Sequence, residues 1–204
     1  MTGDYMTLKD RGQDEFTEKK SRFIGYAAPV ASEEEAVTFI HEIRSKHRDA
    51  RHNVYAYIVN KDGVLNQRYS DDGEPQGTGG MPVLDVIQKQ GLINCCIVVT
   101  RYFGGVLLGA SGLVRAYSHG AAIAVEAAGV LKVVKCTLVK IDIPYSLYDK
   151  VAKYMEEAGY TQESADFAES VVLVYSIPDR QVSAAIEQIT DMTNGRAAAE
   201  RLLP

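Results

Sequence analysis

The thirteen residues Ser70–Pro82 combine carboxylates with glycines and carry the first candidate chemistry of this chain. A histidine lies eighteen residues before this run, and we expect a hairpin to return it to the carboxylates. Histidine and carboxylates within reach of one another can do acid/base work or hold a hard divalent cation. An ordered loop this long is more often functional than a simple turn, so we favour a binding role. The candidate residues of this first motif are His52, Asp71, Asp72, Glu74, Gly77 and Thr78.

A second glycine-rich run, Arg101–Tyr117, follows one apolar strand. Glycines at a helix start leave backbone N–H groups bare at the positive end of the helix dipole, which suits an anion such as phosphate. The run lacks the lysine of a nucleotide-binding P-loop. Tight strand-to-helix connections also need glycine, so a structural explanation stays open. The candidate residues of this second motif are Arg101, Gly104, Gly105, Gly109, Ser111 and Arg115.

Arg101 ends an apolar strand, where a charged side chain needs a partner. One hypothesis is an anionic ligand. The other is an internal salt bridge to a loop carboxylate such as Asp71 or Asp72. The sequence does not decide between them.

A third group of candidates is basic and lies in the N-terminal half. If a nucleic acid or a ribosome binds this protein, we expect it to bind there. Cations are also favoured at a helix C-terminus without any partner, so a solvated helix end is the alternative. The nucleic-acid candidates are Lys19, Lys20, Arg22, Arg44, Lys46, Arg48 and Arg51.

Binding is favoured over catalysis. Ser70, Thr78 and Ser111 have no recognisable nucleophile elbow or fixed histidine partner. We therefore assign no catalytic residue, no metal ligand and no cofactor. An enzyme or phosphate-binding protein that uses His52, Glu74 and Arg101 with the two aspartates remains the alternative, and it requires those side chains to converge on an open pocket.

Composition indicates an ordinary globular protein of one or two domains. The 204 residues are 46% hydrophobic and 24% charged. The longest apolar runs are too short to cross a membrane and the N-terminus is polar, so we expect a cytoplasmic protein without membrane contact. Three cysteines, two of them adjacent at Cys95 and Cys96, indicate buried reduced thiols.

The N-terminal part, residues 1–134, reads as an α+β domain. We expect residues 1–13 to be loosely held. One or two strands follow over 16–30, with a kink at Lys19 and Lys20. A helix over 33–47 is capped by Ser32, and a hairpin covers 53–69. A short helix runs from Pro82 to about 90, a buried strand over 95–102, and a helix capped by Ser111 to 128. We expect the helices to lie on one face of a single sheet, as a two-layer sandwich.

The C-terminal part, residues 135–204, restarts the pattern. Strands at 137–143, 160–166, 170–177 and 197–203 alternate with helices after Pro144 and Pro178, which is the ferredoxin-like βαββαβ order. Residues 136–204 hold 6 Lys and Arg against 11 Asp and Glu, so the net charge of −5 arises there. An acidic domain with one tyrosine on its central strand is a poor RNA binder, but it can serve as a protein-interaction module.

The two motifs, read as SDDGEPQGTGGMP and RYFGGVLLGASGLVRAY in this order, resemble the IMPACT family, including its bacterial YigZ-type members. Residues 19–25 and 51–57 extend the resemblance over about residues 15–130. Gly79 stands where the family pattern has alanine. The resemblance implies a fold like the second domain of a small-subunit ribosomal protein and the fourth domain of elongation factor G. It also implies a regulator linked to translation, since eukaryotic relatives act in starvation control of initiation by binding a large scaffold protein. Together with the basic residues, this leads us to expect RNA, the ribosome or a regulatory protein as partner; the oligomeric state stays open.

Overall fold

The chain is a mixed α/β protein with two domains, as the sequence predicts. The computed structural model describes residues 3–202 and divides the chain into two compact units, Met1–Val133 and Val134–Pro204. Each unit has its own sheet and its own hydrophobic core. Among the described residues, no helix is both long and apolar enough to span a bilayer.

The first unit is built on a five-stranded antiparallel sheet with the order β2-β3-β6-β4-β5. Its strands are β2 (Gly12–Glu18), β3 (Ser21–Pro29), β4 (His52–Lys61), β5 (Val64–Ser70) and β6 (Cys95–Tyr102). Two-residue turns with positive φ connect the hairpins, at Lys19 (φ 44°) and Lys20 (φ 67°) and at Asp62 (φ 52°) and Gly63 (φ 88°). Such turns match the twist of the strands they join. The turn at Asp62 and Gly63 was predicted from the sequence, whereas Lys19 and Lys20 were expected to form a kink and instead form a full hairpin turn.

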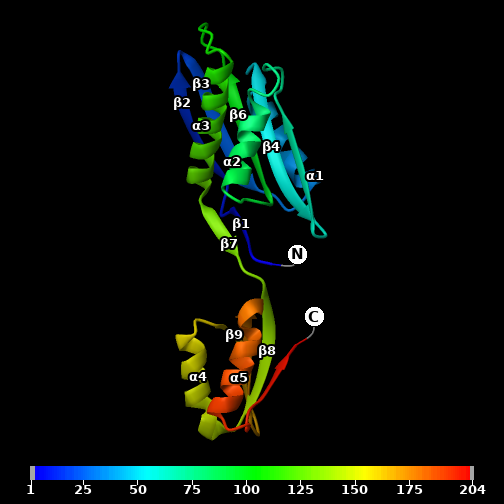
Figure 1. Ribbon diagram of the computed structural model, residues 1–204, viewed down its shortest axis with the longest axis vertical. Coiled ribbons are helices and arrows are strands. Elements are labelled where there is room, and N and C mark those ends of the chain that lie inside the picture. The colour runs from blue at the N-terminus through cyan, green and yellow to red at the C-terminus, as the bar shows by residue number, and fades with distance from the viewer. Residues whose placement is uncertain (1–2, 203–204) are drawn as a thin grey trace. The chain divides into compact units, whose positions relative to one another are not determined.

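Helices cover both faces of this sheet, which corrects the expected two-layer sandwich. Helices α2 (Gly80–Lys89) and α3 (Ala110–Ala128) pack on one face, and α1 (Glu33–Lys46) packs on the other (Figure 1). Neighbouring residues of β6 therefore enter different cores: Ile97 and Val99 face α3, whereas Cys96 and Val98 face α1. An unbroken apolar run is typical of a strand buried on both faces, so β6 itself carried the signal for three layers.

Small residues bring α3 very close to the sheet. A Cβ added to Gly25 would lie 2.1 Å from the carbonyl oxygen of Gly120, and one added to Gly12 would lie 2.2 Å from the backbone nitrogen of Ala128. Both distances are shorter than any real contact, so only glycine fits at these two crossings. The small-residue run of α3 thus predicts its buried position correctly.

Residues near the N-terminus are held in place, in contrast to the loose segment expected. Strand β1 (Tyr5–Leu8) pairs antiparallel with β7 (Val130–Val133), a strand that the sequence did not reveal. Leu8 is buried in the core between the sheet and helices α2 and α3. Because β7 has only four residues, its pattern is too short to recognise.

Two helix starts differ from the sequence prediction. Helix α2 starts at Gly80 and not at Pro82. Ser32 caps α1 by accepting from the N–H of Glu35 at 3.2 Å, and Gly129 (φ 69°) ends α3. Ser111 was expected to cap α3, but it lies inside the helix, and Gly109 (φ 74°) occupies the cap position. In the described part of the chain, no side chain caps α3.

The second unit has the βαββαβ order predicted from the sequence. Its elements are β8 (Cys136–Ile143), α4 (Tyr148–Glu157), β9 (Thr161–Phe167), β10 (Val171–Pro178), α5 (Val182–Met192) and β11 (Ala198–Arg201), with short 3₁₀ turns at Tyr145–Leu147 and Asp179–Gln181. The sheet order is β11-β8-β10-β9, and its core includes Val151 of α4 and Ile189 of α5. Tyr175 of β10 is buried in this core, so it offers no stacking platform for RNA.

The cysteines divide into two groups. Cys95 and Cys96 are buried reduced thiols, as predicted, and burial raises the pKa of Cys95 to about 12. Cys136 is exposed, contrary to the expectation for all three. It begins β8 at the start of the second unit, where only the inward residues of the strand are covered.

Candidate functional site

Strand register places the first two site residues side by side. In the β4–β6 pair, His52 lies opposite Arg101, and in the β3–β6 pair, Phe23 lies opposite Arg101. Residues opposite one another in a sheet share a face, so these three side chains form one row at the end of the sheet. The first glycine-rich loop leaves β5 beside this row and carries Glu74 over it.

Glu74 and Arg101 form a buried ion pair that joins the two motifs. Nη1 of Arg101 donates to Oε1 of Glu74 at 2.6 Å, and the hydroxyl of Tyr117 donates to the same oxygen at 2.7 Å. Arg101 is 5% exposed and Tyr117 is completely buried. Burial raises the pKa of Tyr117, and the Glu74 carboxylate raises it further, so the hydroxyl keeps its proton and donates. This additional donor helps to offset the desolvation cost of the buried carboxylate.

The expected internal salt bridge of Arg101 therefore exists, but its partner is Glu74 and not Asp71 or Asp72. The two aspartates serve the loop instead. The carboxylate of Asp71 accepts from the N–H groups of Gly77, Gly79 and Gly80 at 2.8–3.0 Å, and so it caps the start of α2. Its position nine residues before Gly80 hides this role from a search for helix caps.

Asp72 ties the loop to β4 and α1. Its carboxylate accepts from Arg44 at 2.6 Å and from the backbone N–H of Asn53 at 2.7 Å. Its carbonyl oxygen lies 2.8 Å from Nδ1 of His52, so this nitrogen carries a proton and donates. Nε2 of His52 is thereby left to face Glu74, at 3.9 Å from Oε1.

The guanidinium of Arg101 lies between two aromatic rings. The centroids of Phe23 and Phe103 are each 5.4 Å from its Cζ atom, which is within the range of cation–π attraction. Nη2 makes a long contact of 3.4 Å with the hydroxyl of Ser21. Among the described residues, the buried Nε of Arg101 has no hydrogen-bond acceptor.

A cavity of about 440 Å³ opens above this cluster. His52, Glu74 and Arg101 line it together with Arg51. The rest of the lining is mainly apolar, and part of it comes from the start of α3. These residues are Gly73, Pro75, Phe103, Leu107, Leu108, Gly109, Ala110 and Leu113. The enzyme or phosphate-binding alternative requires its side chains to converge on an open pocket. His52, Glu74 and Arg101 do converge on this cavity, whereas the two aspartates do not line it.

The other residues of the motifs have varied positions. Thr78 is buried, and its hydroxyl donates to the carbonyl of Pro75 at 2.7 Å. Gly104 touches the Lys19–Lys20 turn so closely that a Cβ would lie 1.9 Å from the carbonyl oxygen of Lys20. Gly105 (φ 84°) and Gly109 adopt positive φ. Ser111 is exposed on the first turn of α3.

Arg115 lies outside the first cavity. It lines a separate cavity of about 350 Å³ together with Lys19, Phe16 and His119. This cavity lies between the β2–β3 turn and α3. Two candidates that the sequence assigned to different groups are thus neighbours.

The basic candidates divide according to their partners. Arg22 pairs with Glu15, Arg44 pairs with Asp72, and Lys46 donates to Gln13 at 3.2 Å. Lys19, Lys20, Arg48 and Arg51 are exposed, and no ion pair engages them within residues 3–202. Among the seven nucleic-acid candidates, these four have no side-chain hydrogen-bond or ion-pair partner in the described part of the chain.

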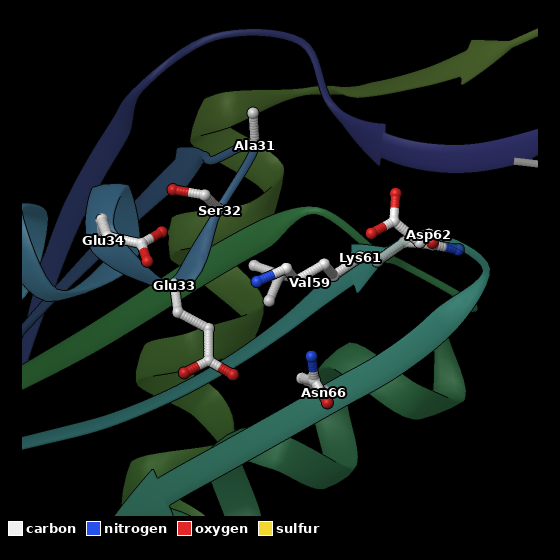
Figure 2. Close-up of a pocket in the computed structure, with 9 residues that line it drawn as sticks. Ala31, Ser32, Glu33, Glu34, Val59, Lys61, Asp62 and Asn66 are labelled. Carbon is white, nitrogen blue, oxygen red and sulfur yellow. The ribbon is translucent and has the colours of Figure 1, made fainter.

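A third cavity, of about 460 Å³, contains none of the candidates from the sequence. Figure 2 shows Glu33 and Glu34 at the start of α1 on one side, and Lys61, Asp62 and Asn66 of the β4–β5 hairpin on the other. Acidic residues are favoured in the first turn of a helix without any ligand, which accounts for the two glutamates. Over the described residues, no group of three or more His, Cys, Asp or Glu side chains is arranged to hold a metal ion.

Sequence reasoning missed four contributors to the site: Ser21, Phe23, Phe103 and Tyr117. Tyr117 and Phe103 lie within the second motif, and this position was the sequence signal that could have identified them as site residues. The hydrogen bond from the buried Tyr117 hydroxyl to Glu74 depends on the tertiary structure and has no signal in the sequence. Ser21 lies 80 residues before Arg101, and only the β3–β6 pairing brings the two together.

These features define a class: a two-domain α/β protein whose first domain joins two glycine-rich motif loops over a buried Glu–Arg pair. The chain belongs to the IMPACT family. The model of the Impact N-terminal domain matches residues 19–125, and that of a domain of unknown function (DUF1949) matches residues 141–196.

Relatives of the full chain confirm the assignment. IMPACT family member YvyE of Bacillus subtilis (strain 168) is 34% identical over 97% of this chain and 90% of its own length. YigZ of Escherichia coli (strain K12) is 31% identical over 87% of both chains. The crystal structure of a hypothetical protein, 27% identical, covers 100% of this chain and 99% of its own with a TM-score of 0.63.

Proposed function

We propose that this chain is a non-enzymatic binding protein that regulates translation, in initiation or in a stress response, through RNA, ribosome or protein contacts of its first domain. Family membership supports the link to translation, because the IMPACT resemblance implies regulators of that process. The observation that carries the binding role is a group of four exposed cations without an ion pair in the described residues: Lys19, Lys20, Arg48 and Arg51. The other three nucleic-acid candidates, Arg22, Arg44 and Lys46, have side-chain partners.

A salt-dependent titration tests this proposal. Purified protein is titrated with RNA and with small ribosomal subunits, and the double variant Arg48→Ala/Arg51→Ala is compared with Lys61→Ala/Lys89→Ala. Both variants remove two exposed cations of the same domain, so the loss of charge is matched and its position differs. Lys89 lies 3.9 Å from Asp85 in an exposed i,i+4 pair, which contributes little. We expect saturable binding that weakens with salt and is lost in the first variant alone. Absence of binding at low salt, or equal loss in both variants, would contradict the proposal.

A second candidate function is a small-anion-binding protein or an enzyme that uses the cavity above Glu74. The convergence of His52, Glu74 and Arg101 on that cavity favours it. Native mass spectrometry of the purified protein checks this candidate. A bound small molecule that denaturation releases, and that is absent from Arg51→Gln protein, would support it. A mass equal to that of the bare chain, before and after incubation with a cell metabolite extract, would count against it.

A further inference from the structure

The cavity lined by Arg51, His52 and Arg101 has two parts of different chemistry. Its floor carries the charged groups, and its wall beside the second loop is apolar: Phe103, Leu107, Leu108 and Leu113. Leu107 is 82% exposed and Phe103 is 40% exposed, although both are large apolar side chains. An exposed apolar wall next to a charged floor suits a ligand with one charged end and one apolar end.

The charge of the floor favours an anion. Glu74 is the carboxylate of the lining, and Arg101 neutralises it at 2.6 Å. Arg51 remains without an ion-pair partner within residues 3–202 and adds a positive charge at the rim. The net charge around the cavity is therefore positive.

The start of α3 adds backbone donors to the same cavity. Gly109 and Ala110 line it, and this nineteen-residue helix begins without a side-chain cap in the described part of the chain. The first N–H groups of a helix have no partner inside the helix, and the dipole attracts negative charge to them. The open space around Gly109, where a Cβ would meet nothing within 4 Å, leaves this approach free.

Arg101 provides an independent sign of a missing ligand. It lines the cavity, it is 5% exposed, and its Nε has no acceptor among the described residues. Buried polar groups in native proteins nearly always have a partner. Nε itself is covered by neighbouring atoms, so an anionic oxygen in the cavity would supply an acceptor after a small shift of the side chains that cover it.

We propose that this cavity binds a small organic anion, a carboxylate or phosphate that carries an apolar group. The anionic end lies against Arg51, Arg101 and the start of α3, and the apolar group lies against Phe103, Leu107 and Leu113. This inference rests on the second candidate function and gives its ligand class. It does not depend on RNA or ribosome binding.

The experiment is a calorimetric titration of the full chain with four probes. Phenyl phosphate and phenylacetate carry both parts of the expected ligand, inorganic phosphate carries the anion alone, and benzyl alcohol carries the apolar ring alone. We expect one of the first two to bind about tenfold or more tightly than either partial probe, because each part adds its own contacts. Comparison of the first two distinguishes a phosphate ligand from a carboxylate ligand.

Two matched pairs of variants locate the binding. Arg51→Gln should weaken binding by about tenfold, whereas Arg48→Gln, an exposed cation three residues earlier that does not line the cavity, should not. Leu107→Ala should weaken it about threefold, whereas its exposed neighbour Val106→Ala should not. All four side chains are exposed, so the variants are expected to fold.

Several outcomes would overturn the inference. They are no binding of either two-part probe at millimolar concentration, equal affinity for inorganic phosphate and phenyl phosphate, or equal effects within each variant pair. Loss of RNA or ribosome binding in the Arg48→Ala/Arg51→Ala variant is a different result, so the failure of one proposal is distinguishable from the failure of the other.

Discussion

The two glycine-rich loops differ in how their polar groups are used. In the first loop, the carboxylates of Asp71 and Asp72 and the buried carboxylate of Glu74 all accept hydrogen bonds from within the fold. In the second loop, the large side chains of Val106 and Leu107 are exposed, and α3 starts without a side-chain cap among the described residues. Both loops line the cavity, but the carboxylates of the first loop are bound within the fold, whereas the second loop supplies most of the apolar wall.

The largest expected effect lies in the contact that joins the two loops. Glu74→Gln leaves the Arg101 guanidinium buried without its counter-charge, and we expect a loss of about 3–5 kcal/mol in the free energy of unfolding. Urea unfolding followed by circular dichroism measures it, since the chain has no tryptophan. Glu15→Gln, which removes an exposed partner of Arg22, is the matched control and should have little effect. Equal stabilities of the two variants would show that the pair does not hold the loops together.

Substitutions at two adjacent glycines test whether the second loop is anchored by its contact with Lys20. Gly104→Ala places a Cβ against the carbonyl oxygen of Lys20, and we expect a loss of about 3 kcal/mol from this overpacking. Gly105→Ala meets no atom within 4 Å and strains only a positive φ, which costs about 1 kcal/mol. The same unfolding measurement ranks them. The reverse order would mean that the loop is not anchored at Lys20.

Substitution of Asp71 tests whether this carboxylate binds backbone groups within the first loop and not a ligand. Asp71→Ala removes the acceptor of three N–H groups at the start of α2, and we expect a loss of about 2 kcal/mol. Hydrogen exchange at Gly77, Gly79 and Gly80 should accelerate in this variant. If Asp71 instead served a ligand, its removal would leave stability and exchange unchanged.

The smallest effect belongs to Ser111 at the start of α3. Since Ser111 does not cap the helix, Ser111→Ala should change the free energy of unfolding by less than about 0.5 kcal/mol. Ser32→Ala is the matched control, because Ser32 does cap α1, and it should cost about 1 kcal/mol. A loss at Ser111 as large as that at Ser32 would mean that Ser111 caps α3, and it would contradict the start of α3 without a side-chain cap.

Much of the local structure followed from the sequence because its signals are local. The hairpin turn at Asp62 and Gly63 and the glycine that ends α3 depend on the φ values of a few neighbouring residues. The strand Cys95–Tyr102 was bounded correctly by its apolar run. The face on which α1 packs was mispredicted, because an amphipathic helix shows which of its own sides is buried but not which side of the sheet receives it.

The candidate site was predictable in its membership but not in its pairings. His52, Glu74 and Arg101 were named from the sequence, and the structure brings them together at the end of the sheet. Arg101 was assigned to the wrong carboxylates, because Asp71, Asp72 and Glu74 lie within four residues and the direction of each side chain depends on the path of the loop.

The sequence by itself determined the family, the two-domain mixed α/β architecture and the residues worth examining, since motifs, turns and periodicity are properties of neighbouring residues. Only the tertiary structure decided which charges are satisfied inside the protein and which are left for a partner. The β3–β6 and β4–β6 registers bring Ser21, His52 and Arg101 together from three distant segments, and the loop path places Glu74 on Arg101 and Tyr117. Burial then makes that pairing obligatory, because an unpaired charge inside the protein is too costly.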